Sequence, residues 1–204
     1  MLYPMSLITN ILNFTIYNLE DYRYYFNQTI NDKYFKELIY DNLNNFQYVV
    51  DEILCGLNKI NSIEGETIIL NDEIDEEKSK INNLWIYLDI FSIFIIKSCK
   101  YYSTIILSSE TRHCLGNILV SVMTNLTVYQ KRYKVKDKSG LNFNPIEILI
   151  TLKSIFLNLI SNKADEEILV KIIGEHDGYV KNSVLRLINI LIKKDEIKSL
   201  EYSY

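Results

Sequence analysis

The sequence predicts an all-α fold, arranged as an armadillo-like or HEAT-like solenoid of helical repeats. Apolar residues recur every three or four positions over long stretches, the spacing that places side chains on one face of a helix. Only two prolines and six glycines interrupt the 204 residues, which favours long elements. No segment shows the alternation and turn spacing of paired strands. Helices with broad apolar faces suit a solenoid, because each pair buries its face against the next, so we expect one helical domain over residues 1–204.

The N-terminal residues 2–19 are apolar, but they lack a positively charged leading region and contain Asn10 and Asn13. Both features argue against a secretory signal, which begins with positive charge and continues as an unbroken apolar stretch. We therefore expect neither a signal peptide nor a membrane anchor at this end.

The first long helix is predicted around residues 35–60. Its apolar positions step by three or four residues without a break, which places them on one stripe of a helix about 30 residues long. They are Phe35, Ile39, Leu43, Phe46, Val50, Ile53, Leu57 and Ile60. The helix is expected to end between Asn61 and Gly65, where small and polar residues collect.

The next helix is predicted to start in the acidic run 72–77, because negative charge favours the positive end of the helix dipole. Its continuation from Ile81 is strongly apolar, so we expect it to be covered on most sides. The most apolar run, 84–96, is interrupted by Asp89 and ends at Lys97. A bilayer span needs about 20 apolar residues, so this run is interpreted as part of a buried helix.

A further helix is expected after Ser108 or Ser109, either of which is placed to cap it. Its apolar positions are Leu115, Ile118, Leu119, Val122 and Leu126. A loop from Thr127 to Phe143 is predicted to follow.

The next helix is predicted to begin at Pro145, whose missing N–H has no partner at the first helical position in any case. Asn144 is placed to cap the free amides, and Glu147, three residues on, completes a capping box. Phe143 is placed to pack against Leu149, which would fix the angle of the chain.

The C-terminal part is predicted to contain helices over about 145–160, 164–173 and 179–193. Ser161-Asn162 and the segment from Gly174 to Gly178 separate them.

Composition and charge exclude some functional classes. The net charge of −4 provides no basic face for nucleic acid. The three cysteines are odd in number and widely spaced, which indicates a reducing compartment and not a disulfide framework.

The cysteines are also not expected to act as nucleophiles. Cys114 follows His113, but adjacent residues of a helix point about 100° apart, so they do not form a nucleophile–base pair. Cys55, Cys99 and Cys114 all lie in apolar helical patterns and are interpreted as small buried hydrophobes.

The remaining motifs of catalysis and metal binding are also lacking. His176 lies between Glu175 and Asp177 and could act as a general base or metal ligand, but a single histidine in a solvated turn is more often a surface residue. There is no C-x-x-C or H-x-x-x-H spacing, no glycine-rich phosphate loop and no Gly-x-Ser-x-Gly elbow. We therefore predict no catalytic residue, no cofactor and no metal site.

Two clusters are candidate binding surfaces, each with a plainer alternative. The aromatic cluster Tyr22, Tyr24, Tyr25 and Phe26 could anchor a protein partner, although core packing is favoured. The loop 127–143 is locally basic and is either a solvated loop or a docking site for an acidic partner. Its basic residues are Lys131, Arg132, Lys134, Lys136 and Lys138.

The stretch from Tyr133 to Leu149, YKVKDKSGLNFNPIEIL, resembles the core region of the Ufd2-type ubiquitin conjugation factors, the E4 ubiquitin ligases. The shared features are the Lys134-Val135 pair, a polar turn through Gly140, and Phe143-x-Pro145 before an apolar helix. Upstream, the segment from Phe35 to Leu54 is similar to a family helix in which an Asn/Asp pair precedes an apolar-apolar-Asp-Glu run.

Downstream segments extend the resemblance. Residues 152–159 look like the family's next helix, and 175–179 followed by Val184 look like its acidic-to-tyrosine turn and closing helix. The resemblance thus covers about residues 35–197.

The resemblance implies a scaffold that holds partners while ubiquitin chains are extended on a modified substrate, in ubiquitin-dependent protein degradation. In the family, the chemistry is delegated to a charged E2 enzyme recruited by a C-terminal U-box, and the helical core binds the Cdc48/p97 ATPase. The sequence ends at Tyr204 soon after the matched region, so we expect no U-box in it, and E2 recruitment to require one supplied elsewhere. Whether the chain is itself a ligase is left open. The family also implies a location in cytoplasm and nucleus.

Two other functions compete with this one. The chain could be a non-enzymatic helical-repeat adaptor that shares only the architecture, since fold does not give function. It could also be a viral-type bundle that sequesters a helical peptide, but the hydrophobic groove with a charged anchor that this would require has no recognisable motif in the sequence.

Overall fold

The computed structural model describes residues 2–18, 33–65, 71–132, 135–136 and 139–159. All the regular structure in these ranges is helical, which confirms the predicted all-α class. The predicted helices 164–173 and 179–193, the turn around His176 and the aromatic cluster from Tyr22 to Phe26 lie outside the described residues.

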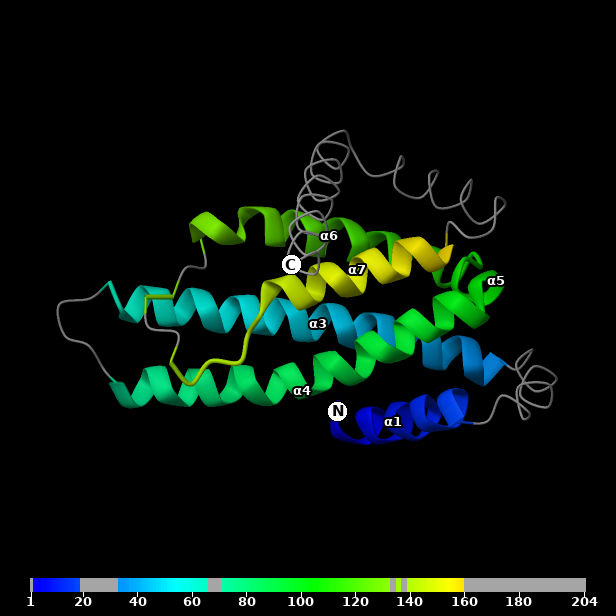
Figure 1. Ribbon diagram of the computed structural model, residues 1–204, viewed down its shortest axis with the longest axis horizontal. Helices are drawn as coiled ribbons and strands as arrows, with labels where there is room; N and C mark the ends of the chain where they lie inside the picture. Colours follow the sequence, from blue (N-terminus) through cyan, green and yellow to red (C-terminus); the bar gives the residue numbers. More distant parts are fainter. Residues whose placement is uncertain (1, 19–32, 66–70, 133–134, 137–138, 160–204) are drawn as a thin grey trace, which may run out of the picture.

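Two long antiparallel helices form the centre of the molecule (Figure 1). They are α3 (Lys33–Ile63) and α4 (Asn71–Tyr101), each of 31 residues. The predicted apolar stripe of α3 is confirmed, because all eight of its side chains are buried in the core. The predicted end of this helix is confirmed as well, since a turn through Glu64 and Gly65 follows it.

The contact between α3 and α4 is close at Gly56. A Cβ atom added there would lie 3.1 Å from Ile81 Cδ1 and 3.3 Å from Glu77 Oε2. Any side chain at this position would require the Ile81 and Glu77 side chains to shift, so glycine suits this close approach of the two helices. The α4 side of this interface is apolar, with Ile81, Phe91 and Phe94 fully buried.

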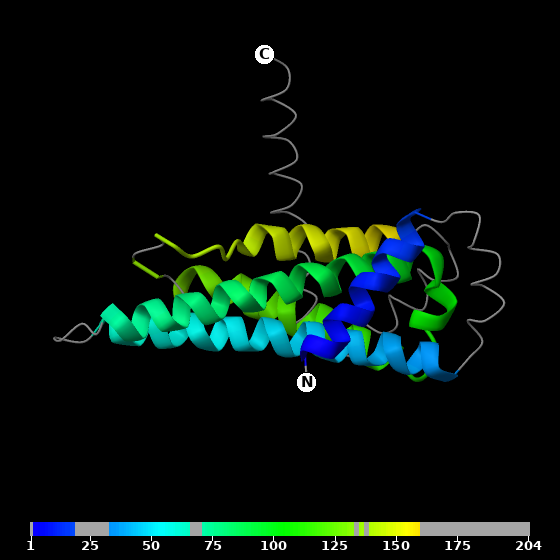
Figure 2. The ribbon, with the colours of Figure 1, turned by 90° about the horizontal axis from the view of Figure 1, so that it is seen from below.

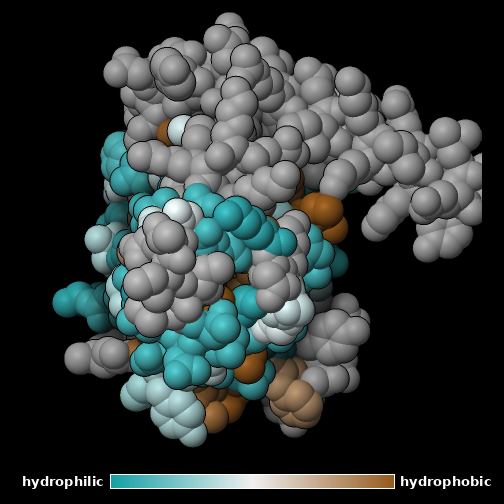
Figure 3. Space-filling model, turned by 90° about the vertical axis from the view of Figure 1, so that its left-hand side faces the viewer, coloured by the Kyte–Doolittle hydropathy of each residue, from teal (hydrophilic) through white to brown (hydrophobic). Residues whose placement is uncertain are grey.

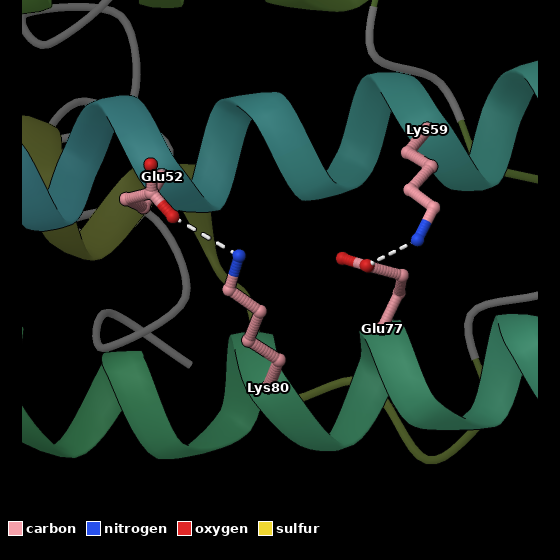
Figure 4. Close-up of polar contacts among 4 residues, drawn as sticks. All are labelled: Glu52, Lys59, Glu77 and Lys80. Atoms are coloured by element: carbon pink, nitrogen blue, oxygen red, sulfur yellow. Dashed lines mark hydrogen bonds and ion pairs between the residues drawn. The ribbon is translucent and has the colours of Figure 1, made fainter.

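Two ion pairs join the rims of the same interface (Figure 4). Lys59 Nζ lies 2.6 Å from Glu77 Oε1, and Lys80 Nζ lies 3.0 Å from Glu52 Oε2. Both lysines are half exposed, and exposed pairs contribute little to stability. These pairs mark the register of the two helices, while the apolar stripe supplies most of the binding energy.

The acidic run is at the start of α4, as predicted. Asp72 and Glu73 lie in its first turn, and both are exposed, as are Asp75 and Glu76. Figure 3 looks onto this end of the bundle, and its described residues are mostly hydrophilic. The start of α4 is thus a solvated, negatively charged tip.

The helix α1 (Leu2–Asn18) crosses α3 and α4 obliquely (Figure 2). It packs mainly on α4 and to a smaller extent on α3. The apolar N-terminal segment is therefore an element of the bundle, attached to the same central helix as α3.

A short helix, α5 (Ser103–Ile106), precedes α6 (Arg112–Arg132), and this corrects the predicted helix cap. Neither Ser108 nor Ser109 caps α6, because the chain first turns through residues 107–111. The Ser108 carbonyl accepts the N–H groups of Thr111 and Arg112. The buried Thr111 hydroxyl oxygen lies 2.7 Å from the Ile105 carbonyl oxygen, which ties the turn to α5.

The predicted loop 127–143 is also too long at its start, since α6 continues through Arg132 and packs on α3. The first residues of that segment, 127–132, are therefore part of the helix.

The helix α7 (Pro145–Leu159) begins where it was predicted. Asn144 Oδ1 accepts the Ile146 N–H at 3.1 Å, and the Glu147 carboxylate accepts from the Asn144 side-chain amide at 2.9 Å. The predicted capping by Asn144 and Glu147 is confirmed. The Glu147 carboxylate, however, bonds to the Asn144 side chain and not to its backbone N–H as in a standard capping box. Phe143 packs edge to face on Trp85, with ring centroids 5.6 Å apart; its contact with Leu149 stays a prediction.

Among the described residues, α4 is the one helix that is long and apolar enough, by length and composition, to cross a membrane. It packs against α3, α1 and α7. Its apolar character matches its place at the centre of the bundle, as the sequence predicted for this segment.

Candidate interaction site

The cysteines are placed for packing. Cys114 is buried, and its thiol donates to Asn44 Oδ1 at 3.1 Å. Burial raises the pKa of the Cys114 thiol to about 11 and also raises the pKa of Cys99. A protonated, buried thiol is a poor nucleophile, so the interpretation of these two residues as small buried hydrophobes is confirmed.

The same prediction for Cys55 is wrong, because Cys55 is exposed. The reason is the phase of the helix. Ile53 and Leu57 both face the core, and a residue two positions from each of them points about 200° away, towards the opposite side.

No catalytic constellation is found in the described ranges. His113 is exposed, whereas the neighbouring Cys114 is directed at Asn44. The described residues also contain no group of three His, Cys, Asp or Glu side chains that could hold a metal ion.

The loop before α7 is tied to α4 by a pair of hydrogen bonds to one side chain. Asn82 Nδ2 donates to the Gly140 carbonyl at 2.7 Å, and Asn82 Oδ1 accepts the Asn142 N–H at 2.8 Å. Gly140 has a φ of 72°, which favours glycine at this turn. The Asn82 side chain thus hydrogen-bonds to the loop backbone at Gly140 and at Asn142.

Two lysines secure the rest of this loop. Lys78 is only 6% exposed, and its Nζ donates to the Ser139 carbonyl at 2.9 Å. Lys136 donates its N–H to Glu64 Oε2 at 2.8 Å and its Nζ to the Glu64 carbonyl at 2.9 Å. Lys136 therefore holds the loop against the end of α3. Docking of an acidic partner by the other basic residues stays a prediction, since their side chains lie outside the described part of the chain.

The helix α1 has its polar and apolar sides reversed relative to a usual surface helix. Ser6, Thr9 and Asn13 are buried beneath it. Its outer face is apolar, and we call these side chains the α1 outer face: Tyr3 (72% exposed), Leu7 (55%), Ile8 (48%), Ile11 (58%) and Phe14 (67%). Contiguous exposed apolar surface of this kind marks interaction sites more often than isolated apolar residues do.

Hydrogen bonds fix this orientation of α1. Thr9 Oγ1 donates to Asn42 Oδ1 at 2.8 Å, inside the bundle. Asn13 Nδ2 donates to the Ile90 carbonyl at 3.0 Å, and Lys97 Nζ donates to the Asn13 carbonyl at 2.7 Å. Burial lowers the pKa of Lys97. The helix cannot roll its apolar side inwards without breaking these bonds.

A hollow of about 630 Å³ lies at the start of α3. Its lining residues are Lys33, Lys36, Glu37, Tyr40, Asp41 and Glu110. Hydrogen bonds from Ser108 and Ser109, with Lys36 nearby, lower the pKa of Glu110. Apart from Tyr40, the residues that line this hollow are charged, with both signs present.

The sequence reasoning did not identify the α1 outer face, although a signal for it exists. Tyr3, Leu7, Ile11 and Phe14 keep helical spacing, and Ser6, Thr9 and Asn13 form a second, polar stripe. The two stripes predict an amphipathic helix, but they do not show which stripe faces the core.

The described residues form an all-α bundle that exposes the apolar α1 outer face. The family model described as the ubiquitin elongating factor core, the Ufd2 core, matches residues 6–203, and the chain belongs to this family. The match confirms the resemblance drawn from the loop before α7 and extends it to most of α1. No curated protein sequence matches the chain significantly. The family ties the chain to ubiquitin chain elongation and to interactions within the ubiquitin pathway.

Proposed function

We propose that the chain acts as a non-catalytic scaffold that holds partners while ubiquitin chains are elongated on a modified substrate. Membership of the elongating factor core family is the observation that carries this proposal. The buried thiols of Cys99 and Cys114 support it, because neither is suited to accept ubiquitin. The role proposed for the chain is to position partners.

The scaffold is proposed to be one part of a helical-repeat solenoid. The antiparallel pair of α3 and α4 is flanked by α1 and by α7 on separate sides of α4 (Figure 2). The helix α7 exposes apolar side chains, among them Ile150 and Leu157. Further helices packed on this side would continue the stack, as neighbouring repeats do in solenoids.

The proposed partners are a Cdc48/p97-type ATPase and, through a U-box supplied on another polypeptide, an E2 enzyme. The proposed location is cytoplasm and nucleus. Family membership supports both at the level of the ubiquitin pathway.

A reconstituted ubiquitination reaction tests the scaffold role. With E1, E2, ATP and ubiquitin, the chain alone is expected to transfer no ubiquitin, and chain elongation is expected when a U-box-bearing polypeptide that binds the chain is added. Cys114→Ala should leave elongation unchanged. A reductant-sensitive ubiquitin adduct that disappears in Cys114→Ala would overturn the proposed division of roles.

A second candidate is an adaptor that connects proteins outside ubiquitin transfer, and the α1 outer face favours it because apolar contact surface serves any helical partner. Capture of the tagged chain from its native cells distinguishes the two. Recovery of p97 or other ubiquitin-pathway proteins supports the scaffold. Recovery of a reproducible partner set without any of them supports the adaptor.

A further inference from the structure

The orientation of α1 leaves a substantial apolar area facing outwards. With five large side chains each about half exposed or more, the α1 outer face presents about 500 Å² of apolar surface. That is near the upper limit for a monomeric protein. Since Thr9 and Asn13 bond the opposite side of the helix to α3 and α4, the face cannot be buried by a rotation of α1.

We infer that the α1 outer face is the contact between two copies of this chain, with α1 packed antiparallel against α1 of the second copy. A two-fold axis passing near position 9 would place Leu7 of each copy against Ile11 of the other. Tyr3 and Phe14 would then lie at the two ends of the contact. The face is self-complementary in this register, as an interface across a two-fold axis requires.

Charge is compatible with self-association. The sequence of α1 contains no Asp, Glu, Lys or Arg, so two copies meet without like-charge repulsion within the contact. The same lack of charge argues against a membrane surface as the occupant, because helices that lie on bilayers have Lys and Arg on their polar face. In α1 the polar face is buried inside the protein.

The area buried in this contact indicates how tightly the two copies bind. Two such faces together bury about 1,000 Å², at the lower limit for a specific interface. We therefore expect a reversible dimer with a dissociation constant in the micromolar range, not a permanent one. This inference does not depend on the proposed scaffold function.

Sedimentation velocity of the full chain, from about 1 to about 200 µM, tests the dimer. Leu7→Asp is expected to raise the dissociation constant at least tenfold, since it places a carboxylate in the centre of the contact. Ile8→Gln serves as a milder variant. The matched control is Ile150→Asp, which changes a residue of similar exposure on α7 and should leave the dimer unchanged.

Disulfide cross-linking tests the register. In a Cys55→Ser background, which removes the exposed native thiol, the double variant Leu7→Cys/Ile11→Cys should form covalent dimers on mild oxidation. Tyr48→Cys, on the exposed side of α3, is the control and should not.

Three outcomes overturn the inference: a monomer over the whole concentration range, a dimer that Leu7→Asp leaves intact, or a monomer that co-sediments with neutral phosphatidylcholine vesicles and loses that binding in Leu7→Asp.

Discussion

The helices α3 and α1 both pack against α4, but they turn opposite sides of their sequences towards it. α3 buries an apolar stripe that includes Phe46 and leaves Tyr48 outside, whereas α1 buries Thr9 and Asn13 and leaves Leu7 outside. The contrast shows that α3 and α1 pack against α4 through different kinds of interaction. The α3 contact is a fully buried hydrophobic core, whereas the α1 contact combines partly buried Leu2, Met5 and Leu12 with an oriented set of hydrogen bonds.

The two contacts differ in energy. A fully buried aliphatic or aromatic side chain contributes about 1.5–3 kcal/mol, and eight such positions form the α3 stripe. A buried hydrogen bond contributes about 0.5–1.5 kcal/mol net. The α1 contact is therefore expected to contribute less to the free energy of folding than the α3 contact, although its hydrogen bonds fix which side of α1 faces the bundle.

Breaking the α3 contact should have the largest effect. Phe46→Ala removes a fully buried ring and is expected to lower the free energy of unfolding by about 3–5 kcal/mol, measured by urea denaturation. The control is Tyr48→Ala, two residues away and half exposed, which should change it by less than about 0.5 kcal/mol. Equal losses in the two variants would contradict the assignment of the buried stripe.

Breaking the α1 contact should have a smaller effect. Thr9→Val leaves buried Asn42 Oδ1 without its donor from α1 and is expected to lower the free energy of unfolding by about 1–2 kcal/mol. Amide hydrogen exchange should speed up in α1 more than in α3. Ser62→Ala, which removes an exposed hydroxyl bonded within α3, is the control and should have almost no effect.

The pH dependence of the free energy of unfolding reports the packing of α6 on α3, because Cys114 of α6 is buried against Asn44 of α3. The pKa of Cys114 is raised to about 11 from 9.0 by burial, so the folded chain keeps this proton between those values while the unfolded chain loses it. The contribution of Cys114 to stability is complete below pH 9 and falls as the pH rises towards 11. At pH 10 the free energy of unfolding is expected to be lower than at pH 8 by about 1 kcal/mol because of this thiol.

The measurement compares urea denaturation at pH 8 and pH 10 for the native chain and for Cys114→Ala. The pH-dependent loss should be smaller in the variant by the contribution of this thiol. Equal pH dependence in both proteins would show that Cys114 ionises as an exposed thiol does.

The smallest effect is expected at the rim of the α3 and α4 interface. Lys80→Met removes the partner of Glu52, and because the pair is exposed we expect a change below about 0.5 kcal/mol. The native protein and the variant should unfold at nearly the same urea concentration, and any difference should shrink in high salt. A loss as large as that of Thr9→Val would mean that ion pairs, and not the apolar stripe, hold the two helices together.

The sequence was sufficient for the features that depend on local spacing. The α3 stripe keeps its helical phase from Phe35 to Ile60, and the start of α7 follows from Asn144, Pro145 and Glu147 alone. Cys55 was assigned wrongly because its apolar neighbourhood was considered without its helical phase. The short helix α5, with four residues, is too brief to show any periodicity.

The candidate site was harder to predict because it depends on contacts between distant residues. Apolar periodicity in α1 suggests a buried face, but it does not show that Thr9 would instead meet Asn42. Similarly, no local signal pairs Asn82 with Gly140, which is 58 residues away. The family loop was recognisable by its own sequence, whereas its attachment to α4 required the structure.

The distance in sequence spanned by the α1 contacts also sets an order of events during synthesis. Asn13 bonds to Ile90 and Lys97, which lie 77 and 84 residues away, whereas Lys59 and Glu77 are only 18 apart. Short loops close at a smaller entropic cost, so the hairpin of α3 and α4 forms first and α1 docks afterwards. During synthesis α1 emerges before α3 and α4, and its bond to Lys97 can form only after Lys97 has followed. Its apolar residues are accessible to chaperones throughout that interval.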